Sequence, residues 1–155
     1  MIRVYRICRK RSARKALDGE GAYRFGGRWS SPGVHLAYTA EHLSLAIIEY
    51  FVHIDPHEQP ADLMLVSGDV PDSVSRTLIP ISRLPPDWRN TPPPPELAHI
   101  GDDFFRHVRA AVLIVPSALA PTDSNWLINP RHPEFRKIRA HEPEPFQHDP
   151  RFLSR

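Results

Sequence analysis

What this sequence lacks excludes several large protein classes. Its one cysteine, Cys8, cannot form an internal disulfide framework and fits a reducing compartment. No apolar run approaches the ~20 residues that a membrane-spanning helix needs. The first residues also lack the apolar core of a secretory signal. We therefore expect a soluble, cytoplasmic protein that does not interact with membranes.

Familiar nucleotide, hydrolase and metal motifs are also missing. "GEGAYR" at 19–24 has the first two glycines of a dinucleotide-binding turn, but Arg24 replaces the third. The sequence has no Gly-Lys-Ser/Thr of a phosphate-binding P-loop and no Gly-x-Ser-x-Gly of a serine hydrolase. "HEQPA" at 57–61 lacks the second histidine of a zinc-protease helix. None of the nine histidines has a convincing ligand spacing, so we expect no metal.

The residues that are present indicate one globular domain with long proline-rich stretches. The 155 residues can bury a core, and 41% hydrophobic and 25% charged residues are ordinary values, so we expect a single domain over 1–155. The 18 prolines are unusually many and concentrate in 80–97 and 141–150. These two stretches are predicted to be rigid loops.

The charge is unevenly distributed. Residues 1–15 carry seven arginines or lysines and no acid, although the net charge of the chain is only +2. Such a segment is either an edge that binds anions or nucleic acid, or a solvated strand and helix start. "IRVYRIC" alternates like a strand, which would turn Arg6 toward a site while the following basic residues stay outside.

Hydrophobic patterning predicts strands on both sides of one strong helix. That helix is expected to run from about 41 to 54 with Thr39 as its N-cap, and a short second helix from Asp102 to Arg109. The remaining predictions are strands at 2–8, 34–38, 62–70, 73–81 and 110–116, a short helix or turn at 11–18, a glycine-rich loop at 19–33, a proline-rich loop to 95, and short extended pieces at 125–130 and 135–140. Because strands and helices do not alternate regularly, we expect an α+β fold with a mixed, split β-sheet and flanking helices.

One carboxylate lies on an apolar helix. In "AEHLSLAIIEYFVHID" (40–55), which we expect to be largely buried, Glu49 shares a stripe with apolar residues and is flanked by His42 and His53. Burying an ionised carboxylate costs several kcal/mol unless it is paired. Glu49 is therefore either a structural residue satisfied by a histidine or arginine, or a catalytic carboxylate in a tuned environment. Helix position leaves both interpretations open.

Two polar segments are candidates for ligand contacts. "RFGGRWSSPGVHLAY" (24–38) is glycine-rich and basic, which is typical of a backbone that approaches an anion. "DSNWLINPRHPEF" (123–135) brings Ser124 and Asn125 to the start of a short apolar stretch. Their hydroxyl and amide groups can bind a ligand at the end of a strand, or form a plain turn.

Three segments together resemble the RES domain family. They are "GGRWSSPGVHLAYTAEHLSLAIIEYFVH" (26–53), "IGDDFF" (100–105), and "VPSA" (115–118) followed by "SNWLINPRHPEF" (124–135). Members of this family are bacterial toxins, usually encoded beside an Xre-type antitoxin. They are similar to ADP-ribosyltransferases in fold and site. The resemblance implies a split mixed sheet that holds NAD, as substrate, in the cleft between its halves.

The resemblance also assigns residues. Arg28 matches the family's arginine in Gly-x-Arg-aromatic, Tyr38 its strand tyrosine 10 residues later, and Glu49 its helix glutamate 11 residues after that. Ser124 matches the family's serine, followed by Asn125. Family activities are hydrolysis or phosphorolysis of NAD and ADP-ribosylation of a protein target, and the sequence leaves the acceptor open.

The cleavage of NAD that the resemblance implies gives each of these residues an expected role. Glu49 would stabilise the oxocarbenium-like transition state, Arg28 would bind the pyrophosphate, and Tyr38 would stack on nicotinamide or its ribose. The further candidates for NAD contacts are Ser124, Asn125, Arg6, Gly27 beside Gly26, and His53 as a supporting partner of Glu49. Trp29 and Trp126 are expected to be packing residues.

The expected partners are NAD, an Xre-type antitoxin and, if ADP-ribose is transferred, a protein target. Direct nucleic-acid binding is not expected. Two alternative functions remain: a nucleic-acid-binding or RNA-cleaving toxin, suggested by the basic N-terminus and nine histidines, and a non-catalytic binding module in which Glu49 is a satisfied core residue.

Overall fold

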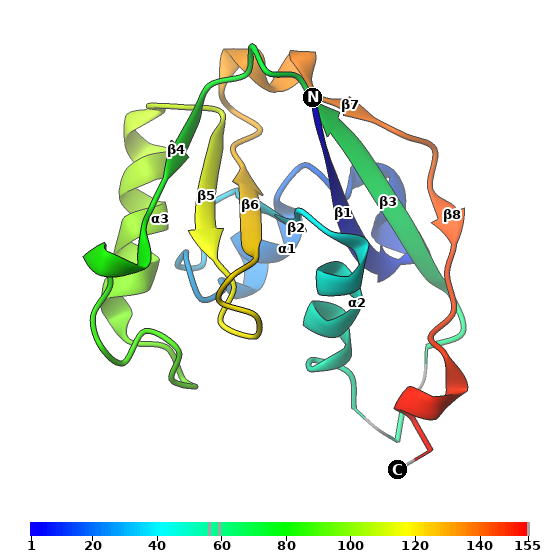
Figure 1. Ribbon diagram of the computed structural model, residues 1–155. Coiled ribbons are helices and arrows are strands. Elements are labelled where there is room, and N and C mark those ends of the chain that lie inside the picture. The colour runs from blue at the N-terminus through cyan, green and yellow to red at the C-terminus, as the bar shows by residue number, and fades with distance from the viewer. Residues whose placement is uncertain (56, 59, 155) are drawn as a thin grey trace.

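The structure is a computed structural model that describes residues 1–154 except 56 and 59. Figure 1 shows a curled sheet with helices on both of its faces. In chain order the elements are β1 (Ile2–Arg9), α1 (Glu20–Phe25), β2 (Ala37–Ala40), α2 (Leu43–Phe51), β3 (Leu63–Val70), β4 (Arg76–Leu78), α3 (Pro95–His107), β5 (Val112–Pro116), β6 (Ser124–Ile128), β7 (Arg139–Ala140) and β8 (Glu144–Pro145). Short 3₁₀ helices lie at Lys10–Lys15, Ile81–Arg83, Pro133–Lys137 and Pro150–Phe152.

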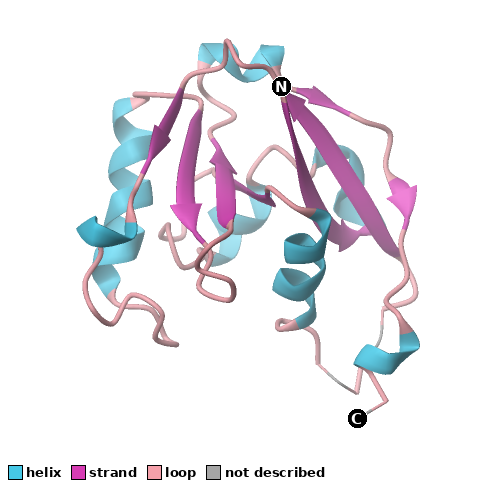
Figure 2. Cartoon of the chain, in the orientation of Figure 1, coloured by secondary structure: helices cyan, strands magenta, loops and turns pink. Residues whose placement is uncertain are grey.

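The sheet is mixed and divides into two groups of strands. Its order is β4-β5-β6-β2-β1-β3-β7, with β8 pairing β3, and the β4–β5 pair is parallel whereas the other pairs are antiparallel. β1 meets β2 at one residue pair, Tyr5 with Ala40, but pairs with β3 along its whole length. The two groups therefore diverge, and α2 lies in front of the place where they part (Figure 2). The predicted α+β fold with a mixed, split sheet is confirmed.

Alternation along the strands supplies a core on each face of the sheet. On β1, Ile7 packs with Leu45 of α2, while its neighbour Cys8 packs on the opposite face with Ala13 of the first 3₁₀ helix. β5 is buried along its whole length because α3 covers it from one side through Leu97 and Phe104. Apolar runs of this kind are typical of central strands covered on both faces.

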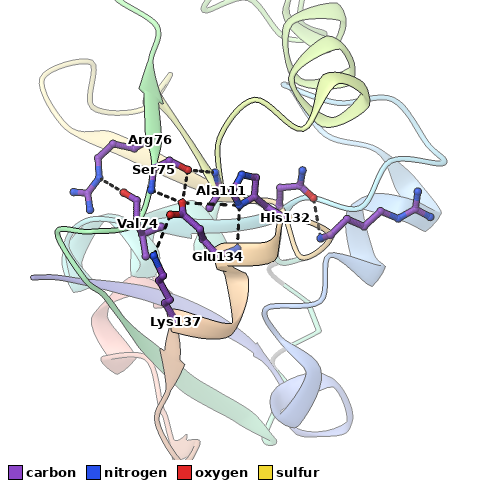
Figure 3. A network of polar contacts seen from close by, with 9 residues as sticks. Val74, Ser75, Arg76, Ala111, His132, Glu134 and Lys137 are labelled. Carbon is purple, nitrogen blue, oxygen red and sulfur yellow. Dashed lines mark hydrogen bonds and ion pairs between the residues drawn. The ribbon is translucent and has the colours of Figure 1, made fainter.

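A polar network fixes the ends of β4 and β5 (Figure 3). The Glu134 carboxylate accepts hydrogen bonds from the Ser75 N–H (2.8 Å) and hydroxyl (2.5 Å), and Lys137 lies 3.1 Å from its other oxygen. The Ser75 hydroxyl in turn accepts from the Ala111 N–H at 3.0 Å. These bonds lower the pKa of Glu134 to about 2. The 3₁₀ helix at Pro133–Lys137 is thereby attached to the strand that leads to the candidate site.

The predicted glycine-rich loop and the predicted helix at 41–54 both differ from the structure. The glycine-rich loop contains helix α1, which ends at Phe25 and is capped by Gly26 in a backbone conformation (φ 69°) that favours glycine. α2 begins only at Leu43 with His42 as its N-cap, because Thr39 lies in β2 and donates its hydroxyl to the Trp126 carbonyl. α2 ends at Phe51, before the expected 54. It is half-buried rather than largely buried, since among its residues Leu45 and Ala46 are the buried ones.

The proline-rich stretch also departs from prediction. α3 begins at Pro95, inside the expected loop, because proline is favoured at the first position of a helix. Asp102 lies in the middle of α3 and accepts hydrogen bonds from the Ser31 N–H and hydroxyl, so it is not a cap. The strand expected at 34–38 is shifted to Ala37–Ala40, and the strand expected at 73–81 is shortened to Arg76–Leu78. A 3₁₀ helix occupies about half of the piece expected at 135–140. Among the described residues, no helix is long and apolar enough to cross a membrane.

Candidate functional site

The Glu49 carboxylate on α2 is held by a serine. Ser117, the residue directly after β5, donates its hydroxyl proton to Glu49 Oε1 at 2.8 Å and is fully buried. Its oxygen accepts the backbone N–H groups of Leu119 (3.1 Å) and Ala120 (3.2 Å). Because those two bonds occupy both lone pairs, the single hydroxyl proton is committed to Glu49. The partner is thus neither the histidine nor the arginine that the structural interpretation of Glu49 supposed.

Arg28 lies in the loop after α1 and is bound by the proline-rich segment. Its Nη1 donates to the carbonyls of Trp88 (2.9 Å) and Asn90 (2.8 Å), and its Nη2 to the Thr91 hydroxyl (3.3 Å). Burial lowers the pKa of this guanidinium, and the negative charge of Glu49 opposes that shift. Arg28 and Glu49 therefore share one electrostatic environment, although they come from different elements.

The hydroxyl of Tyr38 on β2 forms hydrogen bonds with the loop that carries Arg28. Its hydroxyl accepts the Trp29 N–H (3.1 Å) and shares a hydrogen bond with the Ser30 hydroxyl (2.8 Å). Burial raises the pKa of Tyr38 to about 12. A Cβ on Gly27 would lie 2.7 Å from the Tyr38 hydroxyl oxygen. Gly27 is therefore required by the close approach of Tyr38. Stacking of Tyr38 on nicotinamide stays a prediction.

Arg6 joins the two strand groups where they diverge. From β1 it donates Nη1 to the Tyr38 carbonyl on β2 at 3.1 Å. Its Nε is buried and has no hydrogen-bond partner among the described residues. Burial lowers the pKa of this guanidinium. A cation with a buried donor that has no partner among the described residues can bind an anion, and the phosphate contact of Arg6 stays a prediction.

The chain matches the RES domain family over residues 3–150. It belongs to the RES domain family. Toxin Res of Yersinia enterocolitica is 35% identical over 149 residues, covering 96% of this chain and 97% of that protein. The Prs ADP-ribosylating toxin of Sphingobium sp. is 35% identical over 139 residues, covering 88% and 86%. Toxin Res of Pseudomonas putida is 36% identical over 145 residues, covering 92% and 96%.

A solved structure shows the same fold. In the MbcT–MbcA toxin–antitoxin complex of M. tuberculosis, one chain superposes on this RES domain with a TM-score of 0.74 at 20% identity. The match covers 94% of this chain and 84% of that one. The split mixed sheet found here is therefore shared with that toxin–antitoxin structure.

Ser124 and Asn125, which were predicted to contact NAD in this RES domain, form hydrogen bonds within the protein. Ser124, at the start of β6, contributes its backbone, since its N–H donates to Glu41 Oε1 (2.8 Å) and its carbonyl accepts from the Glu41 N–H (3.2 Å). Asn125 donates its side-chain amide to the Thr39 carbonyl at 3.3 Å. The ligand contacts of Ser124 and Asn125 stay predictions.

His53 lies just beyond the end of α2 and is exposed. With Arg9, Phe25 and Tyr50 it lines a cavity of about 730 Å³. Glu49, Arg28 and Ser117 are not among the residues that line this cavity. No hydrogen bond among the described residues joins His53 to Glu49, so its supporting role stays a prediction. Trp29 and Trp126 are buried in the core, as expected of packing residues.

Ser117 is the residue that sequence reasoning missed. It belongs to "VPSA", which the resemblance to the RES family already included. A serine that directly follows a fully apolar strand lies at the end of that strand, where a few polar side chains can line a ligand site. That position was the available signal for Ser117.

Glu41, His42 and Asp123 form a second polar group, with ligand atoms within 4.8 Å of one another. Glu41 already accepts the Ser124 N–H, so one of its oxygens is engaged in joining the two loops. The contacts of this group therefore explain it as a turn-stabilising cluster.

Proposed function

We propose that this RES domain is the toxin of a toxin–antitoxin pair and that it breaks the bond between nicotinamide and ribose in NAD. The observation that carries the proposal is the carboxylate of Glu49, fixed by the Ser117 proton and electrostatically coupled to Arg28. The names of the relatives support it, since one is an ADP-ribosylating toxin.

A single carboxylate is sufficient for this chemistry. Hydrolysis of an O-glycoside uses two carboxyl groups because the departing oxygen must be protonated. Nicotinamide departs from a cationic pyridinium and needs no proton. Glu49 can therefore act alone, stabilising positive charge that develops on the ribose or accepting a hydrogen bond from a ribose hydroxyl. Ser117 occupies Oε1, which leaves Oε2 available to the substrate.

Two arginines can hold the anionic part of NAD. Arg28 uses Nη1 and part of Nη2 on the proline-rich segment, which leaves Nε–H and one Nη2–H for a bidentate contact with phosphate oxygens. Arg6 keeps a buried Nε that has no hydrogen-bond partner among the described residues.

An antitoxin would silence such an enzyme most simply by occupying the cleft. The similarity to a chain of the MbcT–MbcA toxin–antitoxin complex supports a protein partner for this chain. A complex whose partner lies far from Arg28 and Glu49, with NAD still able to enter, would contradict that arrangement.

The test is direct. The purified protein, free of antitoxin, is incubated with NAD with and without phosphate, and products are separated by chromatography. Nicotinamide release that needs Glu49 supports the proposal, and the accompanying product distinguishes hydrolysis from phosphorolysis. Radiolabelled NAD added to a lysate shows whether a protein accepts ADP-ribose. Wild-type protein that releases no nicotinamide under any of these conditions contradicts the proposal.

The matched variants are Glu49→Gln and Arg28→Lys. Glu49→Gln keeps an oxygen that can accept the Ser117 proton but removes the charge, so it should lose activity while remaining folded. Arg28→Lys keeps the charge but loses the planar fork, so it should raise KM more than it lowers kcat. Thermal unfolding of each variant excludes loss of structure as the cause.

A further inference from the structure

Residues 85–91 of the proline-rich stretch contact both halves of the candidate site. On one side, the Trp88 and Asn90 carbonyls and the Thr91 hydroxyl bind the Arg28 guanidinium. On the other side, Arg89 donates Nε to the Ala118 carbonyl at 2.9 Å. Ala118 directly follows Ser117, the residue that fixes Glu49. One short segment thus joins the anion-binding arginine to the turn that holds the carboxylate.

The segment is itself anchored. Trp88 is buried and its ring lies 6.4 Å from that of Trp29, the neighbour of Arg28. Backbone hydrogen bonds from Trp88 to Pro85 (3.1 Å) and from Asn90 to Asp87 (2.9 Å) close two consecutive turns. A loop with a buried aromatic anchor and proline-restricted backbone loses little further entropy when it holds another residue.

On its Arg28 side, the segment selects which donors face the substrate. Both Nη1 protons are used by the two carbonyls, and one Nη2 proton is used by the Thr91 hydroxyl. The donors that remain, Nε–H and the second Nη2–H, lie along one edge of the guanidinium and form one bidentate fork. The segment therefore fixes the orientation of Arg28, and among the described residues nothing accepts from the edge that we propose for phosphate.

On its other side, the segment restrains the turn of residues 117–120. The Ser117 hydroxyl is aimed at Glu49 because the N–H groups of Leu119 and Ala120 occupy its lone pairs. The Arg89 bond to the Ala118 carbonyl holds the peptide at the start of that same turn. Without it, the donors that orient the hydroxyl can move away from Ser117.

We propose that Arg89 is a positioning residue, which through segment 85–91 couples the orientation of Arg28 to that of the Ser117–Glu49 pair. The kinetic part of this inference rests on the proposed NAD cleavage. Arg89 acts on the carboxylate, so its loss should lower kcat and leave KM nearly unchanged. Thr91 acts on the phosphate-binding arginine, so its loss should raise KM and leave kcat nearly unchanged.

The variants are chosen to isolate these two bonds. Arg89→Met keeps the aliphatic chain without donors, and Arg89→Lys restores a donor. Thr91→Val removes the hydroxyl, and Thr91→Ser restores it. Arg83→Met, an exposed arginine of the same stretch outside segment 85–91, is the matched control. Arg89 and Thr91 are exposed, so these variants are expected to fold.

Two measurements decide the proposal. In steady-state nicotinamide release, kcat should be roughly fivefold lower in Arg89→Met, and KM should be roughly fivefold higher in Thr91→Val. Arg89→Lys and Thr91→Ser should restore these values. Arg83→Met should change neither kcat nor KM. Amide hydrogen exchange should be faster at Leu119 and Ala120 in Arg89→Met alone. Unchanged exchange at those two amides overturns the positioning role, whatever the kinetics. Equal kinetic effects of Arg89→Met and Arg83→Met overturn it as well.

Failure of the proposed function has a different signature. If the wild-type protein releases no nicotinamide, NAD cleavage is wrong, and the exchange measurement still decides whether Arg89 restrains the Ser117 turn. If the wild type is active and exchange is unchanged in Arg89→Met, the coupling is wrong and NAD cleavage stands.

Discussion

Replacing Ser117 with alanine removes the group that fixes the candidate catalytic carboxylate. The substitution deletes the 2.8 Å hydrogen bond to Glu49 and leaves the N–H groups of Leu119 and Ala120 without their acceptor. Glu49 keeps its charge and its place on α2. The expected result is an enzyme that folds and binds NAD but cleaves it slowly.

The magnitude follows from the contacts. A hydrogen bond to a charged group contributes about 1.5–3 kcal/mol, and the two longer backbone bonds can be replaced by water because the adjoining loop is partly exposed. We expect a loss of about 2 kcal/mol in transition-state stabilisation, or ~30-fold in kcat. Ser124→Ala is the comparison variant, because the resemblance assigned Ser124 to the site, whereas in this structure Ser124 binds Glu41 through its backbone.

The assay is a double-mutant cycle with Glu49→Gln, followed by nicotinamide release and by urea unfolding. If Ser117 acts through Glu49, Ser117→Ala should cost much less in the Glu49→Gln background, with a coupling energy of about 1 kcal/mol or more. Ser124→Ala should show no coupling. Wild-type activity in Ser117→Ala, or an equal loss in Ser124→Ala, would refute the assignment of Ser117.

Three further predictions concern stability. Gly101→Ala should destabilise the fold by about 3 kcal/mol in urea unfolding, because its Cβ would lie 1.7 Å from the Trp29 carbonyl oxygen, which cannot move aside freely. Hydrogen bonds from Ser75 hold the pKa of Glu134 at about 2, below its ordinary 4.5. That contribution is present above pH 4.5 and lost as the pH falls toward 2, so Glu134→Gln should flatten the acid limb of stability. Burial among aromatic rings lowers the pKa of His148 below 6.5, so folding should weaken as pH falls through that value, and His148→Phe should remove this dependence in unfolding measured between pH 7 and 5.

Local patterns predicted the parts of this protein that local physics determines. The apolar run at 110–116 became a buried strand, and the alternation of "IRVYRIC" became β1. A helix formed around Glu49 because its apolar spacing gives it a face to bury. Arg28 and Glu49 were found by resemblance, and the structure brings them into one electrostatic environment.

Local sequence patterns could not predict the contacts between segments that lie far apart in the chain. Arg28 bonds to residues 60 or more positions away, and nothing local to "GGRW" indicates that Trp88 and Asn90 receive it. Ser117 and Ser124 lie seven residues apart in similar polar surroundings. The choice between them depends on how the turn after β5 folds back on itself. Asp102 was predicted to be a helix cap because its hydrogen-bond partner cannot be read from neighbouring residues. That partner is Ser31, which lies in a loop 71 residues earlier.

Nicotinamide release from NAD by the wild-type protein and by Glu49→Gln tests the central claim most directly. If Glu49 is the catalytic carboxylate, the wild type releases nicotinamide and Glu49→Gln releases at least ~100-fold less, with unchanged thermal unfolding. A Glu49→Gln variant that cleaves NAD as fast as the wild type would contradict it.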